Sequence, residues 1–263
     1  MRVSEVVIAR ADGPVGRVTL NRPEARNAIS VLLGQRLEAA LRELASLPQV
    51  TVIVIRGAGG NFCAGGDFRE MERLRAQGPA ALRPLFENFG RACAAIAELP
   101  VPVVAAVEGY AMAGGFELMQ ASDIALVRDD AILADNHANF AQLPGGGGSQ
   151  RLPRLAGRQR ALGHILSGER LSGAEAAQWG LAYRSFPAAE FDRGVDEFAA
   201  RIAAKDRTAL ATIKRLVYDG LRMPLADGLA MERAAVVEHV CGAEAGAGIA
   251  AFTQRQGTRE VTA

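Results

Sequence analysis

Two runs of almost entirely apolar or β-branched residues constrain the fold of this chain more than any other feature of its sequence. They occupy residues 50–55 and 101–107, and neither alternates between apolar and polar side chains. A run of this kind is typical of a strand that is buried on both faces, as in a parallel sheet covered by helices. Each run leads into a glycine-rich turn and then into a stretch with helical spacing. The sequence therefore predicts an α/β fold whose central strands are parallel.

The rest of the first 130 residues continues this alternation of strands and helices. Residues 3–9 and 16–20 have the pattern of two short strands around a turn. Ser30 is a candidate N-cap for a helix whose leucines recur at helical spacing and which ends before Pro48. Further helices are predicted over residues 67–76, 79–99 and 114–121, and a further strand over residues 123–127.

The C-terminal part of the sequence has a different character. From Ala188 onward almost all of the pattern is helical, with breaks at Asp206, Pro224 and Gly242. No low-complexity linker separates this part from the alternating part. We therefore predict one chain unit with two regions, an α/β core over residues 1–190 and a helical region over residues 191–263.

Composition and charge narrow the classes of protein that are compatible with this chain. Apolar residues make up 49% of the sequence, which is enough for a sizeable core, and the net charge is only +1. Because basic residues form no cluster, we expect no nucleic-acid partner. We expect no membrane span, since no apolar run reaches the length of a bilayer. The sequence does not start like a signal peptide, so we expect a cytoplasmic protein. Its three cysteines show no metal spacing, so we expect reduced thiols and no metal.

Two turns between a strand and a helix are unusually rich in glycine. They lie at residues 62–67 and 109–117. A helix start presents unpaired backbone N–H groups, so two such turns side by side can aim two donors at one oxygen. That arrangement stabilises an enolate or a tetrahedral oxyanion. Taken singly, each turn is better explained as an ordinary tight connection, and it is the pairing of the two turns that favours the oxyanion site.

Glu117 is the candidate acid/base residue of the second turn. It follows Gly114 by three residues, a rise of ~4.5 Å along a helix, so its carboxylate can face the same pocket as the Gly114 amide. Its neighbours are apolar, and an apolar setting raises the pKa of a carboxyl group toward the range useful for proton transfer. The alternative is a glutamate that only complements the helix dipole.

Five ordered segments of the chain resemble the crotonase (enoyl-CoA hydratase/isomerase) family. The resemblance runs from about residue 3 to residue 256. The segments are LNRPEARNAIS at 20–30, FCAGGD at 62–67, PVVAAVEGYAMAGGFEL at 102–118, LPGGGGSQRL at 143–152 and GIAAFTQR at 248–255.

The resemblance implies a fold, a substrate class and a set of site residues. The fold is a β/α spiral core with a helical C-terminal trimerisation region, and the assembly is a homotrimer or a dimer of trimers. The substrate is an acyl-CoA, with no separate cofactor. Its thioester oxygen is held by the amides of Gly66 and Gly114. The remaining implied substrate-binding positions are Arg26, Ala28, Ala64, Gly65, Asp67, Tyr110, Gly115 and Pro144. Arg26 is placed near the CoA phosphates, although an exposed arginine is often only solvated.

One position departs from the pattern of the family's hydratases. Those enzymes use two glutamates, and Glu117 matches the first of them. The second is expected seven residues before Pro144, where this chain has His137. An imidazole titrates near neutral pH and can replace a carboxyl group in proton transfer, and Asp135 can orient the imidazole or substitute for it. The other interpretation is a loop histidine without a role.

The motif set is nearest to an enoyl-CoA hydratase acting on a 2-enoyl-CoA, which is the function we predict from sequence. Alternatives on the same scaffold are an enoyl-CoA isomerase, which fits one glutamate better than two, and a CoA-thioester hydrolase. Glu117 beside two intact loops argues against a non-catalytic CoA-binding protein. The glycine run at 145–148 lacks the lysine of a P-loop, and the glycines at 57–60 do not fit a dinucleotide fingerprint, so we expect no nucleotide cofactor.

Overall fold

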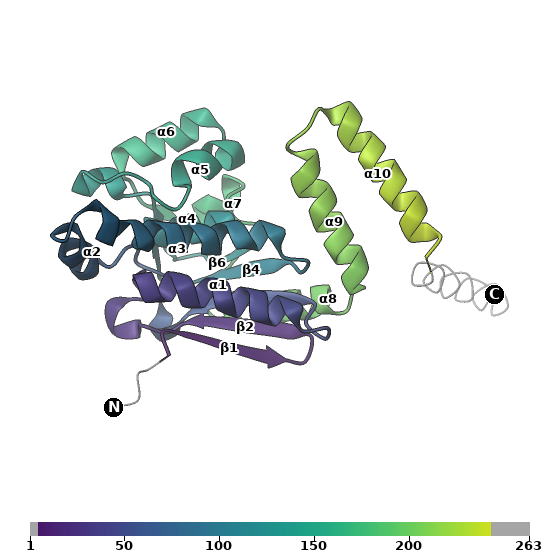
Figure 1. Cartoon of the computed structure of the whole chain (residues 1–263), viewed down its shortest axis with the longest axis horizontal. Helices are drawn as coiled ribbons and strands as arrows, with labels where there is room; N and C mark the ends of the chain where they lie inside the picture. The colour runs from purple at the N-terminus through teal and green to yellow at the C-terminus, as the bar shows by residue number, and fades with distance from the viewer. Residues whose placement is uncertain (1–4, 243–263) are drawn as a thin grey trace. The chain divides into compact units, whose positions relative to one another are not determined.

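The computed structural model describes residues 5–242. The chain divides into two compact units, residues 1–204 and residues 205–263. The closing segment at 248–255, one of the five that carry the family resemblance, lies outside the described residues. The predicted α/β character and the helical C-terminal part are both confirmed (Figure 1).

A six-stranded sheet forms the centre of the first unit. Its strand order is β1-β2-β3-β4-β6-β9, with β1 antiparallel to β2 and every later pair parallel, as predicted for the central strands. The bounds are Val7–Asp12 for β1, Val15–Leu20 for β2, Val52–Gly57 for β3, Val103–Val107 for β4, Ile124–Arg128 for β6 and Arg184–Phe186 for β9.

A smaller three-stranded sheet is formed by strands that are interspersed along the chain with the later strands of the large sheet. It has the order β5-β7-β8, with β5 parallel to β7 and β7 antiparallel to β8. The bounds are Tyr110–Met112 for β5, Ile132–Ala134 for β7 and Leu171–Ser172 for β8. The sequence analysis did not identify these strands, because two or three residues carry too little periodicity to be recognised.

Helices connect the strands, and α1 and α3 lie side by side across the sheet (Figure 1). As predicted, the Ser30 hydroxyl caps the first of them by accepting the Leu33 amide at 3.0 Å. In the first unit the helices are α1 Val31–Ser46, α2 Phe68–Arg75, α3 Pro79–Glu98, α4 Gly114–Ala121, α5 Gly148–Ala156, α6 Arg158–Ser167, α7 Gly173–Gln178 and α8 Phe191–Ala203. Short 3-10 helices span Pro23–Ala25, Ala58–Gly60 and His137–Phe140.

The two apolar runs form β3 and β4, and both faces of these strands are buried. Ile53 and Ile55 belong to the main core, together with side chains of α1 and α3. Val52 and Val54 face the other way and pack in a second cluster with Phe191 and other side chains of α8. Burial on both faces explains why these runs do not alternate. Although α8 follows residue 190, where we predicted the C-terminal region to begin, it belongs to the compact unit that ends at residue 204.

The described part of the second unit consists of two helices, α9 (Arg207–Gly220) and α10 (Leu225–Val240). They contact each other, and the Asp206 carboxylate caps α9 by accepting the Ala209 amide at 2.6 Å. Many of their large apolar side chains are exposed: Ile213, Val217, Leu221, Leu225, Leu229, Val236, Val237 and Val240. Within residues 5–242, no helix is long and apolar enough to cross a membrane.

Candidate active site

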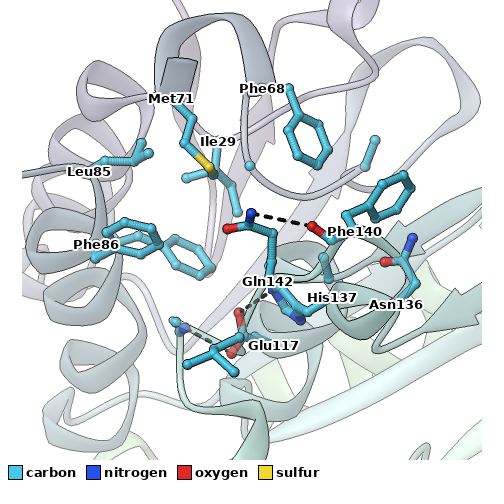
Figure 2. A pocket seen from close by; sticks show the side chains of 18 residues that line it. Ile29, Phe68, Met71, Leu85, Phe86, Glu117, Asn136, His137, Phe140 and Gln142 are labelled. Carbon is cyan, nitrogen blue, oxygen red and sulfur yellow. Dashed lines mark hydrogen bonds and ion pairs between the residues drawn. The ribbon is translucent and has the colours of Figure 1, made fainter. Parts of the chain in front are cut away.

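A pocket in the first unit brings together the two glycine-rich turns and the residues around position 137 (Figure 2). Its walls are largely apolar: Ile29, Phe68, Met71, Leu85, Phe86, Phe89, Phe140 and Leu143. Four polar side chains also line it: Glu117, Asn136, His137 and Gln142. An apolar pocket with a few converging polar groups is the usual form of a small-molecule site.

Backbone hydrogen bonds hold the first turn against the strand that leads into the second. The Cys63 amide donates to the Tyr110 carbonyl at 2.9 Å, and the Met112 amide donates to the Cys63 carbonyl at 3.0 Å. The Cys63 side chain is fully buried, and burial raises the pKa of its thiol to about 12. A thiol that is so weak an acid supplies little thiolate, so Cys63 acts here as a small core residue.

Two glycines allow the turns to approach closely. Gly65 has a φ of +97°, which favours glycine, and a Cβ built on it would lie 2.9 Å from the Ala113 Cβ and 3.0 Å from the Met112 carbonyl oxygen. A Cβ on Gly115 would lie 2.1 Å from the Cys63 carbonyl oxygen, which is too close for any side chain. Ala113 between them has φ +47° and ψ −116°, a strained conformation that directs the chain into α4.

The amides of Gly66 and Gly114 both line the pocket without a hydrogen-bond acceptor in the described part of the chain. The bridge between Ile29 and Gly66 uses the amides of Ile29 and Asp67, at 2.8 and 2.9 Å, and leaves the Gly66 amide unused. Gly114 is the first residue of α4, where an amide has no acceptor within its own helix. The two turns thus supply two neighbouring unpaired donors at the pocket.

Glu117 lies one turn into α4, and its side chain is almost completely buried. Its Oε1 accepts two backbone amides of the glycine run, Gly146 at 2.8 Å and Gly148 at 2.7 Å. Burial raises the pKa of Glu117 above its ordinary value, while the Gly148 amide, His137 and the Gly146 amide favour the carboxylate. A raised pKa makes the carboxylate a stronger base than an ordinary glutamate, while these hydrogen bonds keep the charged form accessible.

The sequence analysis did not identify this role of the glycine run, which it considered only as a possible P-loop. In the structure the run leads into α5 and forms the cradle for Glu117. A Cβ on Gly148 would lie 2.7 Å from Asp135 Oδ2 and 3.2 Å from Glu117 Oε1, and a Cβ on Gly146 would lie 2.9 Å from Glu117 Oε2. The run of four glycines was the available signal, since side chains at these positions would displace the carboxylates.

His137 faces Glu117 across the pocket (Figure 2). Its Nε2 lies 3.9 Å from Glu117 Oε2, and its Nδ1 is bonded to Asp135 Oδ1 at 2.6 Å. Burial lowers the pKa of His137, but the hydrogen bond to Asp135 and the charges of Asp135 and Glu117 outweigh it, so the pKa is raised. His137 is thus a mostly buried pocket residue and not a solvated loop side chain.

The other predicted site residues divide into those that line the pocket and those that do not. Ala64 lines it beside Gly66, and its amide donates to the Arg26 carbonyl. The remaining residues lie outside its lining: Arg26, Ala28, Gly65, Asp67, Tyr110, Gly115 and Pro144.

Two of these residues have contacts of their own near the first turn. Asp67 caps α2 through Oδ1, and its Oδ2 bonds Arg22 Nη2 at 2.7 Å. Burial raises the pKa of Asp67, but the Arg22 guanidinium and the cap amides outweigh it and lower the pKa. The exposed Arg26 guanidinium lies 5.4 Å from the centre of the Tyr110 ring. Within the described residues, no group of three or more histidine, cysteine, aspartate or glutamate side chains could hold a metal ion.

Comparison with known proteins gives consistent results over the length of the chain. Residues 10–259 match the family described as enoyl-CoA hydratase/isomerase. The mitochondrial enoyl-CoA hydratase of Pongo abelii is 31% identical over 255 residues, which are 96% of this chain and 86% of that protein. The crystal structure of an enoyl-CoA hydratase from Polaromonas sp. JS666 is 30% identical, with a TM-score of 0.91, and the match covers 95% of this chain and 97% of the other.

A further solved structure contains coenzyme A. This Thermobifida fusca protein, in complex with CoA, is 30% identical to the chain with a TM-score of 0.80. The match covers 90% of this chain and 93% of the other.

The close approach of the two turns predicts a strong effect of one methyl group. Gly115→Ala places a Cβ against the Cys63 carbonyl, so we expect the free energy of unfolding to fall by about 2 kcal/mol or more. Gly163→Ala is the matched control, because Gly163 lies in α6 with open space around it. This variant should raise the free energy of unfolding by about 0.5–1 kcal/mol. Urea denaturation measures both variants. Equal stability of the two variants would contradict the close approach.

Proposed function

Because this chain belongs to the enoyl-CoA hydratase/isomerase family, we propose that it hydrates a 2-enoyl-CoA thioester to the corresponding 3-hydroxyacyl-CoA. One observation carries the proposal. Two proton-transferring side chains, Glu117 and His137, face each other 3.9 Å apart at a pocket that also presents two unpaired amides. Hydration needs these parts: a base for water, an acid for the α carbon and donors for the developing enolate.

In the proposed mechanism, the thioester oxygen accepts hydrogen bonds from the amides of Gly66 and Gly114. Hydroxide addition at the β carbon moves negative charge from the double bond onto this oxygen and forms an enolate. Fixed donors that point at the oxygen stabilise the enolate more than the neutral substrate, and this difference accelerates the reaction. Their unpaired state in the described structure supports this role.

Glu117 and His137 carry out the two proton transfers. The Glu117 carboxylate removes a proton from water as the oxygen bonds to the β carbon, and the His137 imidazolium donates a proton to the α carbon. The products are the 3-hydroxyacyl-CoA, a protonated Glu117 and a neutral His137. Transfer of the proton from Glu117 to His137 then restores the starting state, and the short separation of the two groups supports that transfer.

For the substrate, we propose an apolar acyl group bound in the pocket and a CoA portion that runs past the first turn. The aromatic and aliphatic walls of the pocket support an apolar acyl group. The CoA complex of the Thermobifida fusca protein supports the CoA portion. The proposed contacts of the CoA portion are Arg26, Ala28, Ala64, Gly65, Asp67 and Tyr110, with Gly115 and Pro144 at the border of the acyl site. No cofactor is proposed beyond the CoA of the substrate.

A panel of CoA esters, with products identified by mass spectrometry, tests this function. We expect a 2-enoyl-CoA to gain the mass of water, and Glu117→Gln to lower kcat by ~10²-fold or more, because the amide cannot accept the proton of water. Conversion of a 3-enoyl-CoA to a 2-enoyl-CoA without water uptake would establish an isomerase instead. Release of free CoA would establish a thioester hydrolase.

Substitutions at position 137 separate the hydratase from the single-glutamate isomerase. We expect His137→Ala to lower the hydration rate strongly and to remove the alkaline limb of the pH profile, because the raised pKa of His137 makes it the proton donor up to that limb. His137→Glu should restore part of the rate by supplying the second carboxyl group of the family's hydratases. Stopped-flow absorbance of the enoyl thioester measures both. Unchanged hydration in His137→Ala would exclude the Glu117–His137 pair.

We further propose that the enzyme is a cytoplasmic homotrimer or a dimer of trimers. The exposed apolar side chains of α9 and α10 support an assembly through these helices, because faces of this kind are normally buried against a partner. Light scattering of the full chain is expected to give three or six times the mass of one chain. A monomer at micromolar concentration would contradict the assembly.

A further inference from the structure

We propose that Asp135 is a positioning residue that fixes the His137 imidazole, so that Nε2 is the only ring nitrogen that exchanges protons with Glu117 and the substrate. The inference deepens the proposed hydration and rests on it for its catalytic consequence. The positioning itself follows from contacts that involve no substrate, and it can be tested separately.

Asp135 reaches His137 from behind, on the side away from Glu117. It follows β7 directly and is completely buried, and its Oδ1 lies 2.6 Å from His137 Nδ1. An ionised carboxylate only accepts hydrogen bonds, so Nδ1 must carry the hydrogen of this contact. In the neutral imidazole the proton is then on Nδ1 and the lone pair is on Nε2, the nitrogen that faces Glu117.

The backbone of Asp135 is itself held in place by a second histidine. The Asp135 amide donates to His164 Nε2 at 3.1 Å, so this nitrogen of the buried His164 carries no proton. Burial lowers the pKa of His164, in agreement with a neutral ring. The His164 ring also contacts Phe116, with ring centres 5.4 Å apart. His164 therefore fixes the backbone of Asp135 and leaves the Asp135 charge for His137.

The second carboxylate oxygen of Asp135 argues against a purely structural role for this residue. Oδ2 has no hydrogen-bond partner in the described part of the chain and lies so close to Gly148 that a Cβ there would be 2.7 Å away. A buried carboxylate with one free oxygen is costly to the folded state, and replacing it by an apolar side chain would often be stabilising. The cost is explained if the charge is needed for His137.

The charged groups around Asp135 and His137 determine whether the imidazole or the imidazolium form of His137 is favoured. Glu117 faces His137 from α4, His164 faces Asp135 from α6, and Arg151 of α5 donates to the Gly146 carbonyl beside Glu117. With His164 neutral, the charges next to the imidazole are the two carboxylates. Both favour the imidazolium, which is the form that donates a proton in the proposed hydration.

Nitrogen NMR of the full chain labelled with ¹⁵N-histidine tests the positioning without any substrate. The chain contains only three histidines, and the His137→Gln spectrum identifies the signals of His137. In the unmodified enzyme we expect Nδ1 of His137 to remain protonated above its pKa and Nε2 to be the nitrogen that titrates. A His137 ring with its proton on Nε2 would overturn the proposal.

Asp135→Asn keeps the shape of the side chain and removes its charge. We expect the His137 titration to move to lower pH by about one pH unit or more, and the alkaline limb of kcat/KM to move with it. We also expect kcat to fall ~10-fold or more with little change in KM, because the residue does not line the pocket. Asp130→Asn, which changes an exposed carboxylate paired with Arg128, is the matched control and should leave both the titration and the rate unchanged.

The readouts distinguish failure of this inference from failure of the proposed function. An unchanged His137 titration in Asp135→Asn would overturn the positioning role even if the enzyme hydrates enoyl-CoA. A shifted titration in an enzyme that does not hydrate enoyl-CoA would uphold the positioning role and reject the proposed function.

Discussion

The exchange of backbone hydrogen bonds between Cys63 and β5 is the interaction on which the site depends. It joins the end of one βα unit to the beginning of the next, through Cys63 to Tyr110 and Met112 to Cys63. Because the two turns are tied at this point, the amides of Gly66 and Gly114 reach the same pocket. Gly115 permits the contact, since any side chain there would meet the Cys63 carbonyl.

Buried polar groups give the pocket its chemistry. Glu117, Asp135 and His137 come from three different segments: α4, the residues after β7 and a 3-10 helix. Backbone amides bond Glu117 and a carboxylate bonds His137, whereas Asp135 has one side-chain contact through Oδ1 and an Oδ2 without a hydrogen-bond partner in the described residues. Burying such groups costs folding free energy, and a catalytic role would explain why they are retained. In an enzyme that adds water to a double bond, the task is to hold one proton ready and one acceptor free.

In the proposed hydration, His137 is the second proton-transferring group, at the position where the resemblance implies a glutamate. An imidazole is a rigid ring, so its Nε2 points where its Nδ1 contact directs it. At position 137 this chain has an imidazole with the Asp135 carboxylate behind it. The structure thus offers a way to retain two acid/base groups when one of the two glutamates is absent.

The sequence by itself determined the parallel βα core, because burial on both faces of a strand leaves a run without alternation, here at residues 50–55 and 101–107. It also determined that Glu117 lies one helical turn after Gly114, since the helix period fixes that spacing. Only the tertiary structure decided that the amides of Gly146 and Gly148 hold Glu117. It also decided that the Asp135 carboxylate bonds His137 and that the Asp135 amide donates to His164. Most of these contacts join residues 29 positions or more apart, and the Asp135–His137 contact depends on a local turn. Local periodicity carries no information about such contacts, because the packing of separate elements creates them.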